Sequence, residues 1–176
     1  PPTMVILLVL ILLLAIGLGV SPVGRRLALG LPLAVLVGFQ GFRIGVELLL
    51  HRAYVEGLMP VQMSYEGRNF DIVSGITAIV VGGLLAAGRM PRWGVWLWNC
   101  AALLLLANIL TIAILSSPVP FRVFMNEPSN VWVTHAPWVW LPAVFVLAAL
   151  VGHLLVFRRL LLDGRAPVRA GYTERS

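Results

Sequence analysis

Long apolar runs, separated by short breaks that contain proline, glycine or charged residues, dominate the pattern of the 176-residue chain. A membrane-spanning helix needs about 20 mostly apolar residues, and five runs approach or exceed that length. They predict transmembrane helices at roughly residues 4–20, 27–50, 72–88, 93–115 and 138–157. We therefore expect an all-α integral membrane protein with one helical domain over residues 1–157 and a basic cytoplasmic tail over residues 158–176.

The composition supports this class and weakens several others. Hydrophobic residues make up 60% of the chain and charged residues 11%, which is far from the values of soluble domains. All the basic residues are arginines, and they give the chain a net charge of +6. No soluble segment combines basic and aromatic residues in a patch, so we predict no nucleic-acid partner. Cys100 is the single cysteine, which excludes a disulfide within the chain. The first run is followed by SPVGRR rather than a small-residue cleavage site, and we interpret it as a retained span.

Arginine placement predicts the orientation, because cytoplasmic loops near span ends accumulate positive charge. In the predicted topology, nine arginines lie on one side of the membrane, at positions 25, 26, 89, 92, 158, 159, 165, 169 and 175. The other side carries Arg52, Arg68 and Arg122. We expect an extracytoplasmic N-terminus and a cytoplasmic C-terminus, in a bacterial inner membrane. The two longer external loops contain VQMSY and FRVFM, whose alternation predicts a small pair of strands.

The second predicted span has polar residues on one face and small residues on the opposite face. On a helix of 3.6 residues per turn, an arc of about 80° holds its polar side chains: Gln40, Arg43, Glu47, His51 and Tyr54. The opposite face carries Gly38, Gly41 and Gly45, a pattern that favours close packing against another helix, either in this chain or in a second copy or partner subunit.

A central arginine or glutamate costs about 2.5–3.5 kcal/mol even on the lenient insertion scale, so these residues require partners or water. The simplest interpretation is structural: Arg43 and Glu47 are four residues apart and pair along one face of the helix. In that case Gln40 and His51 bond to neighbouring helices, and the stripe only holds the bundle together.

The alternative is a binding site, because other predicted segments also bring polar groups to the outer side. The full candidate set is Gln40, Arg43, Glu47, His51, Tyr54, Glu66, Arg68, Asp71, Asn108 and His135. It predicts an outward-facing polar pocket that binds, and in a further step transports, a small polar ligand or ion. Arg43 would meet an anionic group, and Glu47 or Asp71 a proton or cation. Asp71 is also expected to cap the third span, and His153, in the inner half, to bond to a neighbouring helix.

Three other hypotheses use the same region. Glu47, His51, Asp71 and His135 include an i, i+4 pair and could bind a metal ion. His51 and His135 have similar predicted depth, as in a b-type haem site, with Arg43 or Arg68 at a propionate. Glu47, His51 and Asp71 could also act as general acids or bases on a lipid-linked substrate. Either cofactor, or this acid–base chemistry, would make the protein a membrane enzyme. A non-catalytic subunit of a larger complex is a further hypothesis.

Overall fold

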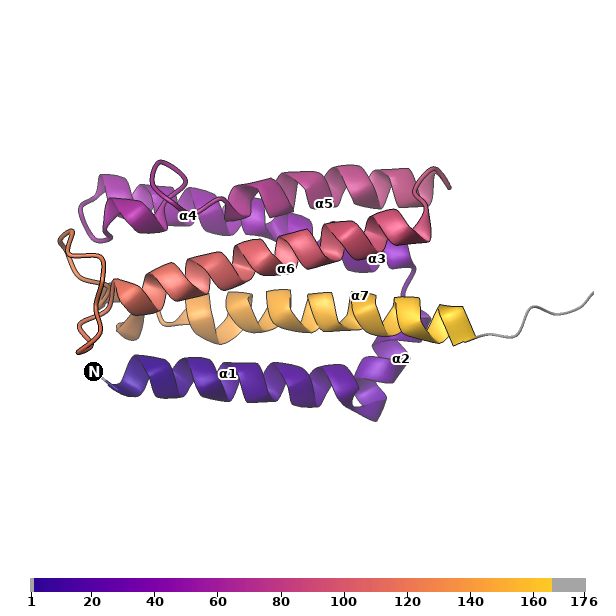
Figure 1. The fold of residues 1–176 in the computed structure, drawn as a ribbon, viewed down its shortest axis with the longest axis horizontal. Helices are drawn as coiled ribbons and strands as arrows, with labels where there is room; N and C mark the ends of the chain where they lie inside the picture. The colour runs from indigo at the N-terminus through magenta and orange to yellow at the C-terminus, as the bar shows by residue number, and fades with distance from the viewer. Residues whose placement is uncertain (1, 166–176) are drawn as a thin grey trace, which may run out of the picture.

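The apolar runs form helices that lie side by side along one long axis, as the computed structural model of residues 2–165 shows (Figure 1). The chain passes through α1 (Pro2–Val20), α2 (Pro22–Gly30), α3 (Leu33–Gly38), the 3₁₀ turn η1 (Phe39–Phe42) and α4 (Arg43–Val55). A second 3₁₀ turn, η2 (Val61–Met63), precedes α5 (Asp71–Ala86) and α6 (Arg92–Leu115). The 3₁₀ turn η3 (Trp132–Thr134) and the π-helical segment η4 (Leu141–Val146) lead into α7 (Leu147–Arg165).

Three of these segments are long and apolar enough to cross a membrane: Leu33–Val55, Arg92–Leu115 and Leu141–Gly164. The bent pair of α1 and α2 makes a fourth if the two helices form one span, and α5 is a shorter apolar helix. The all-helical class is therefore confirmed for the described residues, with three to four segments that are long and apolar enough to span a membrane. Residues 2–165 contain no strand, so the predicted strand pair is wrong. The VQMSY backbone instead closes local turns, and Val123 and Phe124 donate to the Leu115 carbonyl at the end of α6.

Proline shifts the start of the second span. Leu31 is extended (φ −100°, ψ 140°), as expected for a residue before proline, and it ends α2. The span begins at Leu33 instead of near residue 27, so Arg43 lies near the middle of this helical segment. α2 forms a separate short helix, bent 64° away from α1 and capped by the Ser21 side chain.

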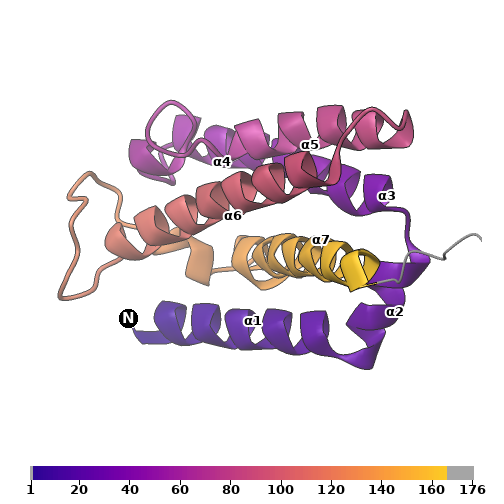
Figure 2. The ribbon, with the colours of Figure 1, turned by 45° about the vertical axis from the view of Figure 1, so that its right-hand side comes forward.

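The last helix also differs from its prediction. It continues to Arg165, so the segment that was assigned to a tail is helical as far as that residue, and residues 166–176 lie outside the described part of the chain. Arg158 donates to the Gly19 and Ser21 carbonyls at 2.6 and 2.7 Å, which ties α7 to the corner between α1 and α2. In Figures 1 and 2, α7 runs between α1 on one side and α3 to α6 on the other.

Small residues form the contact between the second span and α5. A Cβ atom at Gly75 would lie 2.9 Å from the Ile44 backbone nitrogen, and one at Gly82 would lie 3.1 Å from the Gly38 Cα. Gly41 meets the Ile79 side chain in the same interface. Two glycines of the predicted face therefore pack inside this chain, whereas a Cβ at Gly45 would meet no atom within 4 Å.

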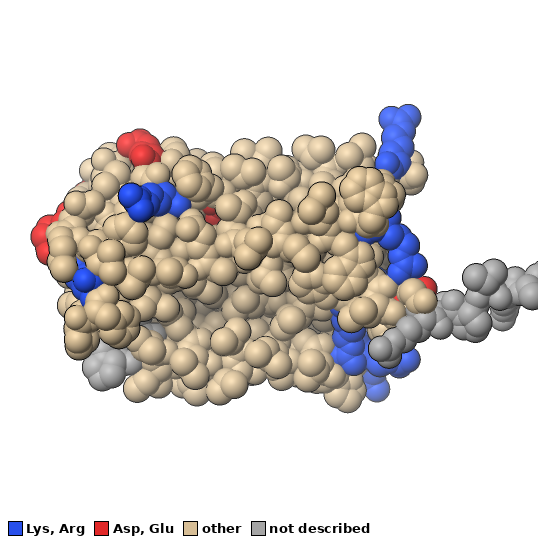
Figure 3. All heavy atoms as spheres, in the orientation of Figure 1, with Lys and Arg blue, Asp and Glu red and all other residues tan. Residues whose placement is uncertain are grey.

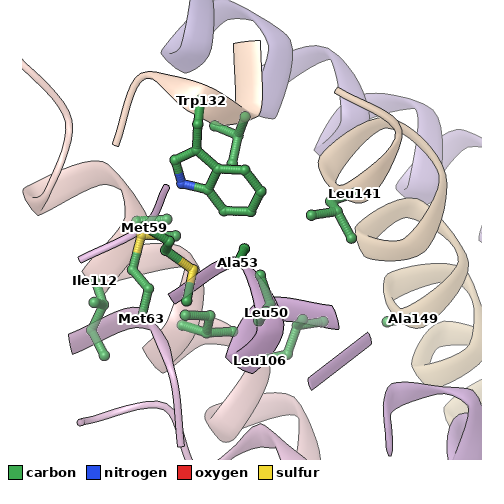
Figure 4. Close-up of a cluster of buried hydrophobic side chains, with 12 residues drawn as sticks. Leu50, Ala53, Met59, Met63, Leu106, Ile112, Trp132, Leu141 and Ala149 are labelled. Atoms are coloured by element: carbon green, nitrogen blue, oxygen red, sulfur yellow. The ribbon is translucent and has the colours of Figure 1, made fainter. Parts of the chain in front are cut away.

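Two apolar clusters fill the bundle, one toward each end. The cluster near the loop-bearing end includes Leu50, Leu106 and Trp132 (Figure 4), and the other includes Val37, Ala78 and Leu155. Along the second span, residues 40, 43 and 47 lie between the two, since Val37 belongs to one cluster and Leu50 to the other. The polar stripe therefore separates two apolar cores.

We expect Gly75→Ala to destabilise the bundle by about 1–3 kcal/mol, because the new methyl group would overlap the Ile44 backbone. Gly83→Ala, in the same helix, meets no atom within 4 Å and should be neutral or stabilising, since alanine is the better helix former. Thermal unfolding of the two variants in mild detergent measures the difference. Equal melting temperatures would contradict the close packing of this seam.

Candidate functional site

A belt of buried polar side chains crosses the bundle between the two apolar clusters. Its members come from the second span, the loop before α5, and helices α5, α6 and α7, and none is more than 5% exposed. They are Gln40, Arg43, Glu47, Asn69, Asp71, Ser74, Asn99 and His153. Because hydrocarbon offers no hydrogen bonds, the question for each side chain is which partner it has.

Arg43 and Asp71 form the central ion pair of this belt. The Arg43 Nε donates to Asp71 Oδ2 at 2.7 Å, and its Nη2 donates to Asp71 Oδ1, so the pair is bidentate. Ser74 Oγ also donates to Asp71 Oδ1. The predicted pairing of Arg43 with Glu47 is therefore wrong. A carboxylate on the facing helix can accept both arms of the planar guanidinium at once, which is the stronger geometry.

Asn69 connects the two buried carboxyl groups. Its Nδ2 lies 2.9 and 2.7 Å from the two Glu47 oxygens and 3.0 Å from the Met63 carbonyl. Its Oδ1 accepts the Asp71 backbone N–H at 3.0 Å. Asp71 does not cap α5, because its side chain faces Arg43 and the capping position, Phe70, has no side-chain hydrogen bond.

On its other side, the belt continues through His153 to α6. Arg43 Nη1 lies 3.1 Å from His153 Nε2 and 3.4 Å from the Ala102 carbonyl. Arginine can only donate, so Nε2 accepts and the ring proton is on Nδ1, which donates to Asn99 Oδ1 at 2.8 Å. Asn99 Nδ2 returns a bond to the His153 carbonyl. His153 bonds to a neighbouring helix as expected, and also to Arg43.

A cavity of about 80 Å³ adjoins the belt on the loop-bearing side. Arg43, Glu47 and Asp71 are its charged residues, and the rest of its lining is apolar, including Leu50, Met63, Leu106, Leu141 and Ala149 (Figure 4). The lining thus differs from the polar pocket that the sequence predicts. At roughly 10–15 Å³ per water, the cavity has room for a few waters or a very small organic molecule.

The remaining candidate residues do not line this cavity. Gln40 is buried behind it and donates to the Ala149 carbonyl at 3.0 Å. His51 stacks on Tyr65, with ring centroids 4.5 Å apart, and lies 3.5 Å from the Glu66 carboxylate. Tyr54 is half-buried beside the apolar cluster near the loops.

Arg68, Asn108 and His135 belong to the loop-bearing end. The Arg68 guanidinium lies over the Phe124 ring, and its backbone carbonyl accepts a bond from Asn108 at 2.9 Å. His135 is exposed and contacts the Val131 carbonyl. These three residues hold loops in place and are not part of the buried belt.

The predicted metal set is not assembled. Over the described residues, no three histidine, cysteine or acidic side chains converge in a way that could hold a metal ion. Each of these side chains has another partner. Asp71 pairs with Arg43, Glu47 accepts a hydrogen bond from Asn69, and His51 stacks on Tyr65. His51 and His135, the predicted haem pair, make separate contacts on different segments.

Sequence reasoning missed the roles of three residues. Asn69 lies in a loop, where helical periodicity carries no information, and its burial depends on the loop folding inward. Asn99 was not a candidate, and for His153 a bond to a neighbouring helix was expected but not the contact with Arg43. The periodicity of one helix does not show which residues of another helix face it.

A family model matches residues 1–161. The chain belongs to the DUF8737 family. DUF8737 is described as a domain of unknown function, so membership shows that the chain is related to other proteins but gives no information about a ligand or a reaction. No curated protein and no solved structure matches the chain. For this DUF8737 member, the functional argument therefore depends on the belt and its cavity.

In this DUF8737 protein, we expect Arg43→Gln to lower the free energy of unfolding by about 3–5 kcal/mol, because it leaves Asp71 buried without its cation. Adding Asp71→Asn should restore much of that loss, since the remaining groups are neutral amides. A double-mutant cycle by thermal unfolding in detergent measures the coupling.

The control is Arg52→Gln, whose ion pair with Glu56 is exposed and contributes at most about 1 kcal/mol. If Arg43→Gln is no more destabilising than Arg52→Gln, the central pair does not hold the bundle.

Proposed function

We propose that this protein spans the membrane five times and binds a small molecule in the cavity beside the polar belt. The ligand has an apolar body and one positively charged, hydrogen-bond-donating group, which pairs with Glu47. One observation carries the proposal: the Glu47 carboxylate, 1% exposed, lies on the wall of an otherwise largely apolar cavity.

The direction of the helices supports five crossings. Successive long segments run in alternating directions, and the start of α1 and the end of α7 lie at opposite ends of the bundle (Figure 1). α5 has 16 residues, or about 24 Å of helix, which is shorter than the roughly 30 Å of bilayer hydrocarbon. We propose that the buried loop before it, which includes Ser64 and Asn69, completes the third crossing.

The charge distribution supports the predicted orientation. Figure 3 shows few charged residues in the middle of the molecule, arginines at the end that carries α2 and the last turns of α7, and mixed charges at the opposite end. The arginine-rich end suits the cytoplasmic side. The cavity then lies between the middle of the membrane and the external surface.

The charges of the belt favour a cation. Among the described residues, the buried charged side chains are Arg43, Glu47 and Asp71, so two carboxylates share one guanidinium. Arg43 is committed to Asp71 in a bidentate pair, and an unpaired buried carboxylate is costly. A proton or a cationic ligand at Glu47 would balance the site.

The hydrogen bonds support the same choice of ligand. In the described part of the chain, Asn69 is the one residue that donates to Glu47, and its Nδ2 is shared with the Met63 carbonyl. Glu47 therefore retains acceptor capacity, whereas the Arg43 donors face Asp71, His153 and Ala102. This weakens the hypothesis that Arg43 receives an anion. Transport, if it occurs, would use Glu47 to exchange a proton for the ligand.

We expect small cations to stabilise the protein through Glu47. The probes are tert-butylammonium, tert-butanol and pivalate, which share one apolar body and differ in the charge of the head group. In mild detergent at neutral pH, tert-butylammonium should raise the melting temperature in a saturable way, because ligand binding to the folded state adds stability. Glu47→Gln should abolish the shift, whereas Glu66→Gln, at an exposed site, should preserve it.

Two results would contradict this assignment. Stronger stabilisation by pivalate would point to Arg43 as the binding group. Equal effects of all three probes, unchanged by Glu47→Gln, would mean that the cavity has no charge-selective site.

The five-span topology predicts which positions can be labelled from outside. In a Cys100→Ser background, a cysteine at Glu127 should react with a membrane-impermeant maleimide in intact cells, and a cysteine at Arg89 only after lysis. Both lie in exposed connections at opposite ends of the bundle. The same labelling from outside at both positions would exclude the five-span arrangement.

A further inference from the structure

A second hollow, of about 470 Å³, shares no lining residue with the Glu47 cavity. It is bounded by α1, by α3 with η1, and by the η4–α7 stretch. Every lining residue is apolar or glycine: Leu18, Leu31, Val35, Leu36, Phe39, Ala143, Val144, Leu147, Ala148, Val151, Gly152 and Leu155. We call this hollow the lateral groove.

The lateral groove opens on the surface of the bundle that faces lipid. Val35 is 51% exposed, Phe39 54% and Val144 43%, although all three line the groove. Its volume falls in the range of roughly 300–1,000 Å³ that small-molecule sites occupy. An occupant that enters from the bilayer and meets only apolar atoms is a hydrocarbon chain.

The short basic helix α2 ends at the groove. Leu31 lines the groove and ends α2, and Arg25 and Arg26 are exposed on that short helix about 8–9 Å earlier along its axis. Figure 3 shows the arginines gathered at this end of the molecule. α2 is bent 64° from α1, so it lies oblique to the bundle, as a basic helix at a membrane surface does.

α7 holds this basic helix in place. Arg159 Nη1 donates to the Ala28 and Leu29 carbonyls at 3.0 and 2.9 Å, and lies 3.4 Å from that of Leu31. These bonds occupy Arg159 and fix the end of α2 beside the groove. Arg25 and Arg26 belong to this same short helix.

We propose that the lateral groove binds one acyl chain of an anionic phospholipid whose phosphate lies against Arg25 and Arg26. The apolar lining selects the chain, and the two arginines select the charge of the head group. An arginine near an anionic membrane surface contributes roughly 1 kcal/mol, or about fivefold in occupancy. This site is separate from the cavity at Glu47 and does not depend on its function.

The test is lipid retention by the full chain. The protein is reconstituted into vesicles of equal phosphatidylcholine and phosphatidylglycerol, extracted into mild detergent, separated by size and analysed for bound lipid by mass spectrometry. We expect phosphatidylglycerol to be retained with about fivefold or greater enrichment. Ala148→Phe, which fills the groove, should remove the retained lipid, and Arg25→Gln with Arg26→Gln should remove only the enrichment.

Matched variants separate this site from general effects of substitution. Ala101→Phe places the same side chain on an exposed part of α6 outside the groove, and should leave retention unchanged. Retention at the vesicle ratio by the unaltered chain would overturn the proposal, as would equal loss in Ala148→Phe and Ala101→Phe. A dimer that Ala148→Phe converts to a monomer would instead assign the groove to a second copy of the chain.

Discussion

The buried ion pair between Arg43 and Asp71 is the constraint to which the rest of the bundle conforms. A guanidinium at the middle of a membrane-spanning helix is costly unless a carboxylate meets it in good geometry and the remaining N–H groups are bonded. Asp71 supplies the carboxylate, while His153 and the Ala102 carbonyl accept from Nη1. One side chain thereby fixes the positions of α5, α6 and α7 relative to the second span.

That pairing explains why α5 is short. Because Asp71 must lie at the depth of Arg43, α5 begins inside the bundle, and the chain before it continues without helix. Irregular backbone is tolerated at this depth only when protein surrounds it. Ser64 and Asn69 are fully buried, and Asn69 bonds to Glu47, to the Met63 carbonyl and to the first N–H of α5. The loop is therefore an integral part of the core.

Glu47 differs from the other charged residues of the belt in its partners. Arg43, Asp71, Asn99 and His153 satisfy one another, which is what a purely structural network requires. Glu47 departs from that rule, because it has one donor and faces a cavity whose other walls are mostly hydrocarbon. This combination of a single donor and an adjoining cavity is the reason for which we propose Glu47 as the binding group.

Much of the architecture follows from the chain read residue by residue. Apolar runs of sufficient length identify the helices, the period of 3.6 residues puts Gln40, Arg43 and Glu47 on one face, and the small residues of the second and third runs identify a close contact. That contact proved to be internal, between α3, η1 and α5. The errors came from local exceptions to periodicity: the break at Pro32 moved the start of the second span from near residue 27 to Leu33, and the loop before α5 folded inward and buried Asn69.

The sequence by itself determined that the protein is helical and apolar, which face of the second span is polar, and which end is rich in arginine, because these properties depend on spacing along one segment. Only the tertiary structure decided that Arg43 pairs with Asp71, that Asn69 bridges to Glu47, and that the adjoining cavity is largely apolar. Partner choice depends on the depth and rotation of separate helices. Those are set by packing between segments far apart in the chain, which no local pattern encodes.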